Sequence, residues 1–194
     1  MVEPNNFSSI TNNNCSELQK LLQAGEWEKA DNETLAIMLR ASKREQEGWL
    51  DLEHLKQFPD SELNIINQLW VNYSNEHFGF SVQKNIWQKS HGKNFIWEVG
   101  WFKLSSCWTN TQGRIDFQTI FDITAPQGHL PRYILRNSIR RDGSPNIYRW
   151  SWGSKSSFHL KGERTRANAF YFFNQAYEKY EKDIDCILSH QYLE

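Results

Sequence analysis

The chain has 194 residues, enough for one domain with a sizeable core, and its 22 basic and 23 acidic residues leave a formal net charge of −1. This balance gives no overall field that would attract nucleic acid or an anionic membrane, so we expect no nucleic-acid partner and at most peripheral membrane contact. No apolar run approaches the length of about 18 residues that a membrane-spanning helix needs. The three cysteines Cys15, Cys107 and Cys186 lack disulfide or metal-ligand spacing, which indicates reduced thiols.

The N-terminal part predicts a leader followed by short helices. Residues 1–14 are rich in Asn and Ser and almost free of apolar side chains, so we expect a disordered leader. A capping box that begins at Ser16 predicts a helix that closes at Gly25. Asp31 or Asn32 is predicted to cap the next helix, whose apolar residues fall on one face.

The central part predicts a short helix that stops at Pro59 and a longer one that is capped by Asp60 and ends near Ser74. The apolar face of the longer helix consists of Leu63, Ile66, Trp70 and Tyr73. A glycine between two phenylalanines follows at residues 78–80, and Ser81 can cap another helix. This corner is either a packed part of the core or the wall of a flat apolar site, and spacing alone favours the core.

The next part is aromatic and interrupted by turns. Residues 95–101 predict an aromatic helix or turn, Trp108 falls in a loop rich in Thr, Asn and Gly, and Asp116 is predicted to cap a short segment that ends at Phe121. The sequence APQGHLP at residues 125–131 contains two prolines and a glycine, which predicts a stiff loop.

The C-terminal part predicts a basic segment and a closing helix. Residues 132–152 combine five arginines with tyrosine and tryptophan, so they form a solvated basic loop, a nucleic-acid patch or, as below, a ligand rim. Residues 163–188 place aromatic and aliphatic side chains on one helical seam. This helix either docks on its own domain or forms a coiled-coil-like dimer contact; we expect the first, and a monomer.

No motif predicts catalysis. The sequence has no phosphate-binding glycine loop, no nucleophile elbow and no HExxH pattern, and its six histidines show no ligand spacing. We therefore predict no catalytic residue, no metal site and no enzyme activity.

Several motifs resemble one known family. The stretch ELNIINQLWVNYSNEHFGFSVQKNIW at residues 62–87, the earlier AGEWEKADNETLAIML and the later APQGHLP are similar, in order, to the Genomes Uncoupled Four family. That family comprises tetrapyrrole-binding proteins that assist magnesium chelatase in chlorophyll synthesis. One difference is visible, since Asp60 stands where the family commonly has a cysteine after the proline.

The resemblance implies an all-α fold, a compact multi-helix domain with a concave ligand groove, which we place at residues 15–160. The helical periodicity of residues 163–188 adds a C-terminal helix, in an extension at residues 161–194. The expected function is to bind protoporphyrin or magnesium protoporphyrin without changing it and to stimulate magnesium chelatase, with the large porphyrin-binding subunit of the chelatase as partner. A bilin carrier, with Cys107 as a candidate attachment point, and a pigment-free protein-interaction module are the alternatives.

The resemblance also implies the ligand-binding residues Phe78, Phe80, Val82, Trp101, Trp108, His129, Leu130, Arg132 and Arg136. The first three would form an apolar wall, the two tryptophans a stacking surface, the two arginines the partners of the propionates, and His129 with Leu130 the anchors of a loop. His129 could also be an axial ligand to magnesium, but we expect it to make a structural hydrogen bond instead. The expected location is a cyanobacterial cytoplasm or a plastid stroma, because the N-terminus lacks the pattern of a signal or transit peptide.

Overall fold

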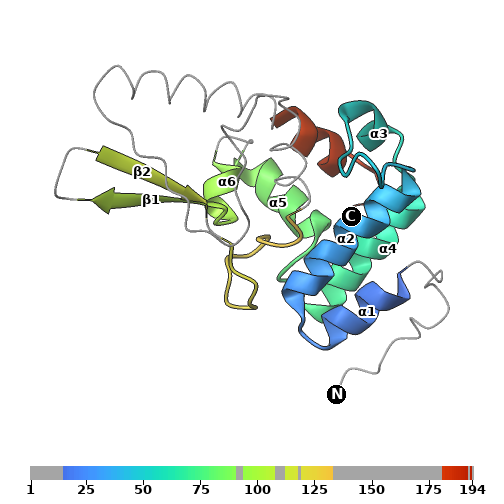
Figure 1. The fold of residues 1–194 in the computed structure, drawn as a ribbon. Helices are drawn as coiled ribbons and strands as arrows, with labels where there is room; N and C mark the ends of the chain where they lie inside the picture. Colours follow the sequence, from blue (N-terminus) through green and yellow to red (C-terminus); the bar gives the residue numbers. More distant parts are fainter. Residues whose placement is uncertain are drawn as a thin grey trace.

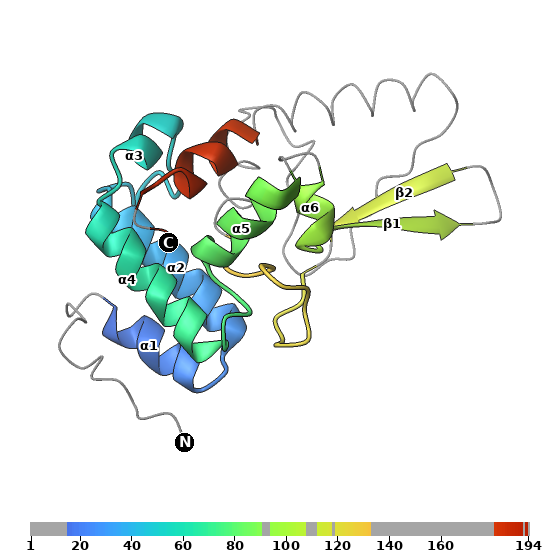
Figure 2. The same ribbon diagram turned by 180° about the vertical axis from the view of Figure 1, so that it is seen from behind.

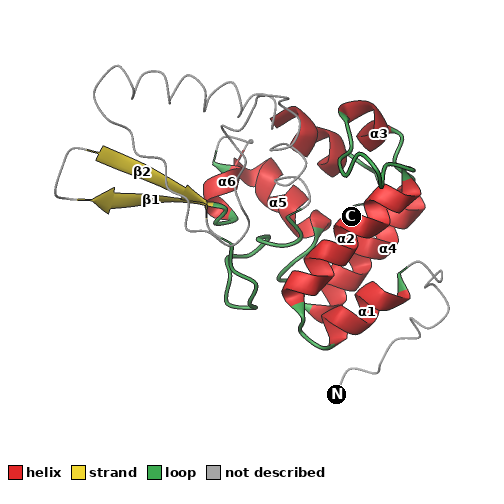
Figure 3. Ribbon diagram, in the orientation of Figure 1, coloured by secondary structure: helices red, strands yellow, loops and turns green. Residues whose placement is uncertain are grey.

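The computed structural model describes residues 15–90, 94–107, 112–117, 119–132, 181–191 and 193, and of residues 102–107 and 112–117 only the backbone. The helices are α1 (Ser16–Gln23), α2 (Trp27–Ala41), α3 (Leu52–Lys56), α4 (Asp60–Tyr73), α5 (Phe80–Ser90) and α6 (Phe95–Glu98), and residues 181–188 are also helical (Figure 3). The predicted helical class is confirmed. None of the helices in these ranges is long and apolar enough to cross a membrane.

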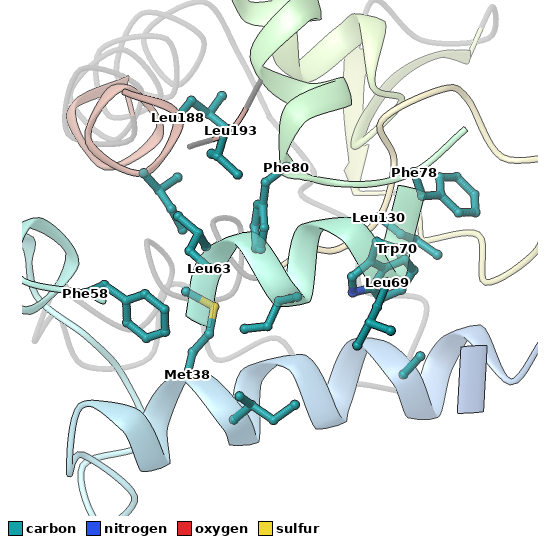
Figure 4. Packing of buried hydrophobic residues seen from close by; sticks show 14 of the residues in the cluster. Met38, Phe58, Leu63, Leu69, Trp70, Phe78, Phe80, Leu130, Leu188 and Leu193 are labelled. Carbon is teal, nitrogen blue, oxygen red and sulfur yellow. The ribbon is translucent and has the colours of Figure 1, made fainter. Parts of the chain in front are cut away.

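The core begins where α1, α2 and α4 meet. Helix α1 packs on both α2 and α4, and the apolar stripes predicted from spacing face inward (Figure 4). A buried hydrogen bond of 2.9 Å from Trp70 Nε1 to Thr34 Oγ1 joins α4 to α2. The hydroxyl of Thr34 also donates to the carbonyl of Ala30, so the indole of Trp70 is satisfied without water.

The helix ends follow the predictions at the C-terminal side better than at the N-terminal side. Gly25 and Asn75 have positive φ angles of 70° and 52° directly after α1 and α4, as glycine and asparagine favour. Helix α2, however, begins at Trp27, so the predicted cap at Asp31 or Asn32 is wrong. Asp31 is instead buried inside α2, where it has a long-range partner that local sequence does not show.

A two-stranded antiparallel hairpin extends from the end of α6 (Figures 1 and 2). Strand β1 (Phe102–Cys107) pairs with β2 (Gln112–Phe117), with Phe102 opposite Phe117 and Cys107 opposite Gln112. The predicted cap at Asp116 is wrong, because Asp116 pairs with Lys103 inside the hairpin. Trp108 lies outside the described residues.

The C-terminal helical residues pack beside α3 and α5 (Figures 1 and 2). Ile184, Ile187, Leu188 and Leu193 are buried, and Figure 4 shows Leu188 and Leu193 close to Phe80. The side chain of His190 lies between the carboxylate of Asp60 and the carbonyl of Leu55. For residues 181–188, the prediction that the closing helix docks on its own domain is confirmed, whereas residues 163–180 lie outside the described chain.

Candidate functional site

The turn between α4 and α5 is held by side chains that replace missing backbone partners. Ser74 Oγ accepts a hydrogen bond of 2.8 Å from the amide of Phe78 and donates to the carbonyl of Trp70. Asn67 Oδ1, from inside α4, accepts a hydrogen bond of 2.8 Å from the amide of Ser81. The start of α5 is therefore capped by Asn67 of the neighbouring helix, not by the predicted Ser81.

The phenylalanines of this turn face the core. Phe78 and Phe80 are both fully buried, and Val82 is almost so. The ring of Phe78 packs edge-on against Trp27 and Trp70, with centroid distances of 5.5 and 6.3 Å. Without a rearrangement these rings cannot touch a ligand, so their role as an apolar wall stays a prediction.

The loop of residues 119–132 is clamped onto this turn. The side-chain amide of Gln83 donates to the carbonyls of Gly128 and Pro131, at 2.9 and 2.8 Å. The amide of Gly79 donates to the carbonyl of Leu130, whose side chain is fully buried. Position 128 is restricted to glycine by a φ of +74° and by Ile86 and Val99, which would contact a β-carbon there. The loop therefore leaves the helices with a fixed direction.

His129 braces the interior of the same loop. Its Nδ1 donates to the carbonyl of Val99 at 2.7 Å, and its Nε2 accepts from the amide of Ile120 at 3.0 Å, so the ring is a neutral imidazole with the proton on Nδ1. Burial lowers the pKa of His129, although the hydrogen bond to Val99 opposes this shift. Because both nitrogens are engaged, His129 cannot act as an axial ligand to magnesium in this conformation.

Trp101 lies behind His129. Its indole is fully buried, donates to the carbonyl of His129 at 2.7 Å and packs edge-on against Phe95 at 5.4 Å. A buried indole of this kind offers no stacking face to a ligand, so the predicted stacking role of Trp101 is not seen in this conformation.

Arg132 ends the loop in a buried ion pair. Asp31 accepts hydrogen bonds from the backbone amide of Arg132 at 2.7 Å and from Nη2 at 3.0 Å. The guanidinium also donates to the hydroxyl of Thr119 and lies over the ring of Phe121, 4.3 Å from its centroid. Because the guanidinium is buried and engaged by Asp31, its predicted contact with a propionate would need this ion pair to open. Arg136 lies outside the described residues.

Among the described residues, two large apolar side chains that were not predicted as site residues are exposed. Trp97 on α6 is 38% exposed and Ile123 in the 119–132 loop is 44% exposed. The two segments are joined by the hydrogen bond between His129 and Val99. Spacing gave no signal for either residue, because exposure is decided by how α6 and the loop pack.

The predicted concave groove over residues 78–82 is not seen in the described part of the chain. A cavity of about 640 Å³ lies between α3 and the C-terminal helical residues instead. Its lining is mixed in charge, with Lys56, Asp60, Lys182 and Asp185 beside Phe58. The described residues contain no group of three or more side chains that could hold a metal ion.

These features define a helical domain whose α4–α5 turn carries a clamped loop. The sequence model of the family described as GUN4-like matches residues 8–142, which is more than half of the chain. The protein belongs to the GUN4-like family.

Similar proteins agree with this assignment. A Ycf53-like protein of Synechocystis is 38% identical over 128 residues, which are 63% of this chain and 51% of that protein. A protein of Arabidopsis thaliana named "Tetrapyrrole-binding protein, chloroplastic" is 28% identical over 120 residues, 58% of this chain and 44% of that protein. The chain thus spans about half the length of the curated relatives it matches.

Two solved structures share the fold. The ligand-free structure of Arabidopsis thaliana GUN4 aligns with a TM-score of 0.60 at 21% identity, over 95% of this chain and 97% of that one. The structure of GUN4 from Chlamydomonas reinhardtii aligns with a TM-score of 0.51 at 26% identity, over 60% and 78% of the two chains.

Proposed function

We propose that this protein binds a tetrapyrrole, protoporphyrin or magnesium protoporphyrin, without changing it, and that it stimulates magnesium chelatase by presenting or receiving the pigment. The observation that carries the proposal is the family match over residues 8–142, supported by a relative that is named a tetrapyrrole-binding protein. The proposed chelatase partner is its large porphyrin-binding subunit.

We place the pigment on the surface formed by α6, the 119–132 loop and the turn beneath them. Trp97 and Ile123 supply exposed apolar area there, and Phe78 and Trp101 are buried in the turn and just after α6, whereas Phe80 faces Leu188 and Leu193. His129, Leu130 and Arg132 act through the loop, because their hydrogen bonds and packing hold the loop in place as far as Arg132. Trp108 and Arg136 are assigned to stacking and to propionate binding.

The free energy of binding a porphyrin to such a surface is favourable. Removing about 300 Å² of apolar area from water contributes roughly 7 kcal/mol. Charge-assisted hydrogen bonds to the propionates add about 1 kcal/mol each, while immobilising the ligand costs at least about 4 kcal/mol. With two such contacts the balance is about 5 kcal/mol, which corresponds to a Kd of roughly 0.2 mM. The apolar face therefore supplies most of the affinity, and the arginine sets the orientation.

Fluorescence titration tests the proposal. Deuteroporphyrin added to the purified protein should quench tryptophan emission with a Kd at or below roughly 0.2 mM. The variant Arg136→Gln should bind about tenfold more weakly because one charge-assisted contact is lost, whereas Arg40→Gln on the exposed face of α2 should bind like the wild type. The absence of quenching up to about 1 mM pigment, in a folded protein, would contradict pigment binding.

The role toward the chelatase is tested separately. The protein should raise the rate at which magnesium chelatase inserts magnesium into deuteroporphyrin, and Arg136→Gln should raise it less at limiting pigment. If the protein binds porphyrin but leaves the chelatase rate unchanged, the proposed ligand stands and the proposed chelatase partner is contradicted.

A further inference from the structure

The histidines differ in whether a ring nitrogen is left for a ligand. In the described chain the rings of His129 and His190 each contact hydrogen-bonding partners through both nitrogens. His54 and His77 each use one nitrogen only. A neutral imidazole with one nitrogen protonated and bound to an acceptor presents its other nitrogen as a lone-pair donor, which is the state that binds metal ions.

His77 has this arrangement with a fixed tautomer. Its Nε2 lies 2.7 Å from the carbonyl oxygen of Ala125, which can only accept, so the proton is on Nε2. Among the described residues Nδ1 has no hydrogen-bond partner. The backbone holds the same position, since the carbonyl of His77 accepts from the amide of Gly128 at 2.9 Å. A histidine that donates one N–H to a backbone carbonyl matches the outer-shell arrangement of metal-binding histidines.

The position of His77 connects it to the proposed pigment surface. Its half-buried ring contacts the ring of Phe78 at 4.7 Å, and its hydrogen-bond acceptor Ala125 is two residues from the exposed Ile123. His54 lies on α3, where its Nδ1 is 2.6 Å from a carboxylate oxygen of Asp51, the residue that caps the same helix. Figures 1 and 2 show α5 and the C-terminal helical residues between α3 and α6, so α3, which carries His54, does not border this surface.

We propose that His77 is the axial ligand, through Nδ1, to the metal ion of a metallated tetrapyrrole; this inference rests on the proposed function. The lone pair of Nδ1 replaces a water on the metal, and no proton is released because Nδ1 carries none. Nδ1 of His77 would supply one nitrogen ligand to that metal, while the hydrogen bond from Nε2 to Ala125 would hold the ring in place. Zinc, whose geometry is not set by its d electrons, accepts such a site, and imidazole suits zinc better than magnesium.

The test compares free-base, magnesium and zinc deuteroporphyrin. The wild type should bind the zinc form about tenfold more tightly than the free base, with magnesium between them, and zinc binding should shift the Soret band to the red. In His77→Gln the amide nitrogen can still donate to Ala125, so the Kd of the free base should be unchanged. The ratio of the free-base Kd to the Kd of the zinc form should fall to about one, and the red shift of the Soret band should disappear. His77→Arg, which also offers a donor to Ala125 but no lone pair, should likewise lose the preference for the zinc form over the free base and the spectral shift.

His54→Gln is the matched control and should keep both the preference and the spectral shift. The axial assignment is overturned if His77→Gln keeps the zinc preference of the wild type, or if His54→Gln removes it. It is also overturned if the wild type binds zinc and free-base pigment equally. A failure of all three pigments to bind any variant or the wild type would instead contradict the proposed function, so the two failures are distinguishable.

Discussion

The buried side chains of Asp31 and His129 connect parts of the chain that lie far apart in sequence. Asp31 in α2 binds Arg132, 101 residues away, and His129 links Val99 to Ile120. Taking such groups out of water is costly, and their partners recover the cost only when all of them are present. The position of the 119–132 loop therefore depends on the contacts of Asp31 and of His129.

Replacing Asp31 by Ala should lower the free energy of unfolding by about 3–5 kcal/mol, because it leaves the guanidinium of Arg132 buried without its carboxylate. Urea denaturation followed by far-UV circular dichroism measures the change. Asp31→Leu combined with Arg132→Met should recover much of the loss, since neither charge is then buried. Glu33→Ala, in the exposed pair with Arg40, should cost less than about 1 kcal/mol, and an equal loss there would refute the reasoning.

His129 should make the free energy of unfolding decrease as the pH falls. The pKa of His129 is lowered in the folded protein, so as the pH falls through about 6.5 the unfolded chain takes up a proton that the folded chain does not. The free energy of unfolding therefore decreases below about pH 6.5. In His129→Asn, which can still donate to Val99, stability should be lower near pH 8, and the deficit relative to the wild type should narrow toward pH 5. A deficit that is constant with pH would contradict this assignment.

At the scale of elements, the turn from α4 to α5 shows what can and cannot be predicted from a sequence. Periodicity located α4, and the position of Asn75 predicted where it ends. The cap of α5 is Asn67, an interior residue of another helix, and no local pattern identifies it. The aromatic helix or turn predicted at residues 95–101 is confirmed by α6, whereas β1 and β2 were not predicted, because strand pairing is a contact between segments.

Gly79 in this turn should not tolerate a side chain. Its φ is +134°, and an added β-carbon would lie 2.8 Å from Cγ2 of Val71 and 3.1 Å from Oδ1 of Asn67. We expect Gly79→Ala to cost about 1–3 kcal/mol in the free energy of unfolding, measured by urea denaturation. Gly25→Ala is the control, since Gly25 also has positive φ but no atom within 3.4 Å of that carbon, and it should cost only about 1 kcal/mol. Equal losses would show that steric contact plays no part.

The candidate site was predicted less well than the fold. The motifs identified the segments that meet, since residues 78–82, 101 and 128–132 are joined by hydrogen bonds. Which of their side chains face solvent was not predictable, because aromatic residues in a core and in a binding surface have the same composition. Arg132 illustrates the limit, as its guanidinium is paired with a carboxylate that only the three-dimensional structure brings near.

At the scale of the whole molecule, residues 181–193 complete the core that α3, α4 and α5 begin. Leu188→Ala should lower the free energy of unfolding by about 2–5 kcal/mol, because it opens a cavity beside other buried apolar residues. Asp185→Ala on the exposed face of the same helix should change it by less than about 0.5 kcal/mol. Thermal and urea unfolding measure the free energy of unfolding of the two variants. If Leu188→Ala leaves it unchanged, the apolar side of this helix would be a contact surface for a partner instead.

The contacts of His190 with Asp60 and Leu55 also affect how the chain folds during its synthesis. These contacts span 130 and 135 residues, and contacts of such long range form slowly because a large loop has to close first. On the ribosome, α3 and α4 emerge long before their last apolar partners are synthesised. During that interval part of their apolar surface stays uncovered, so nascent chains of this protein should be bound by chaperones until residues 181–193 leave the exit tunnel.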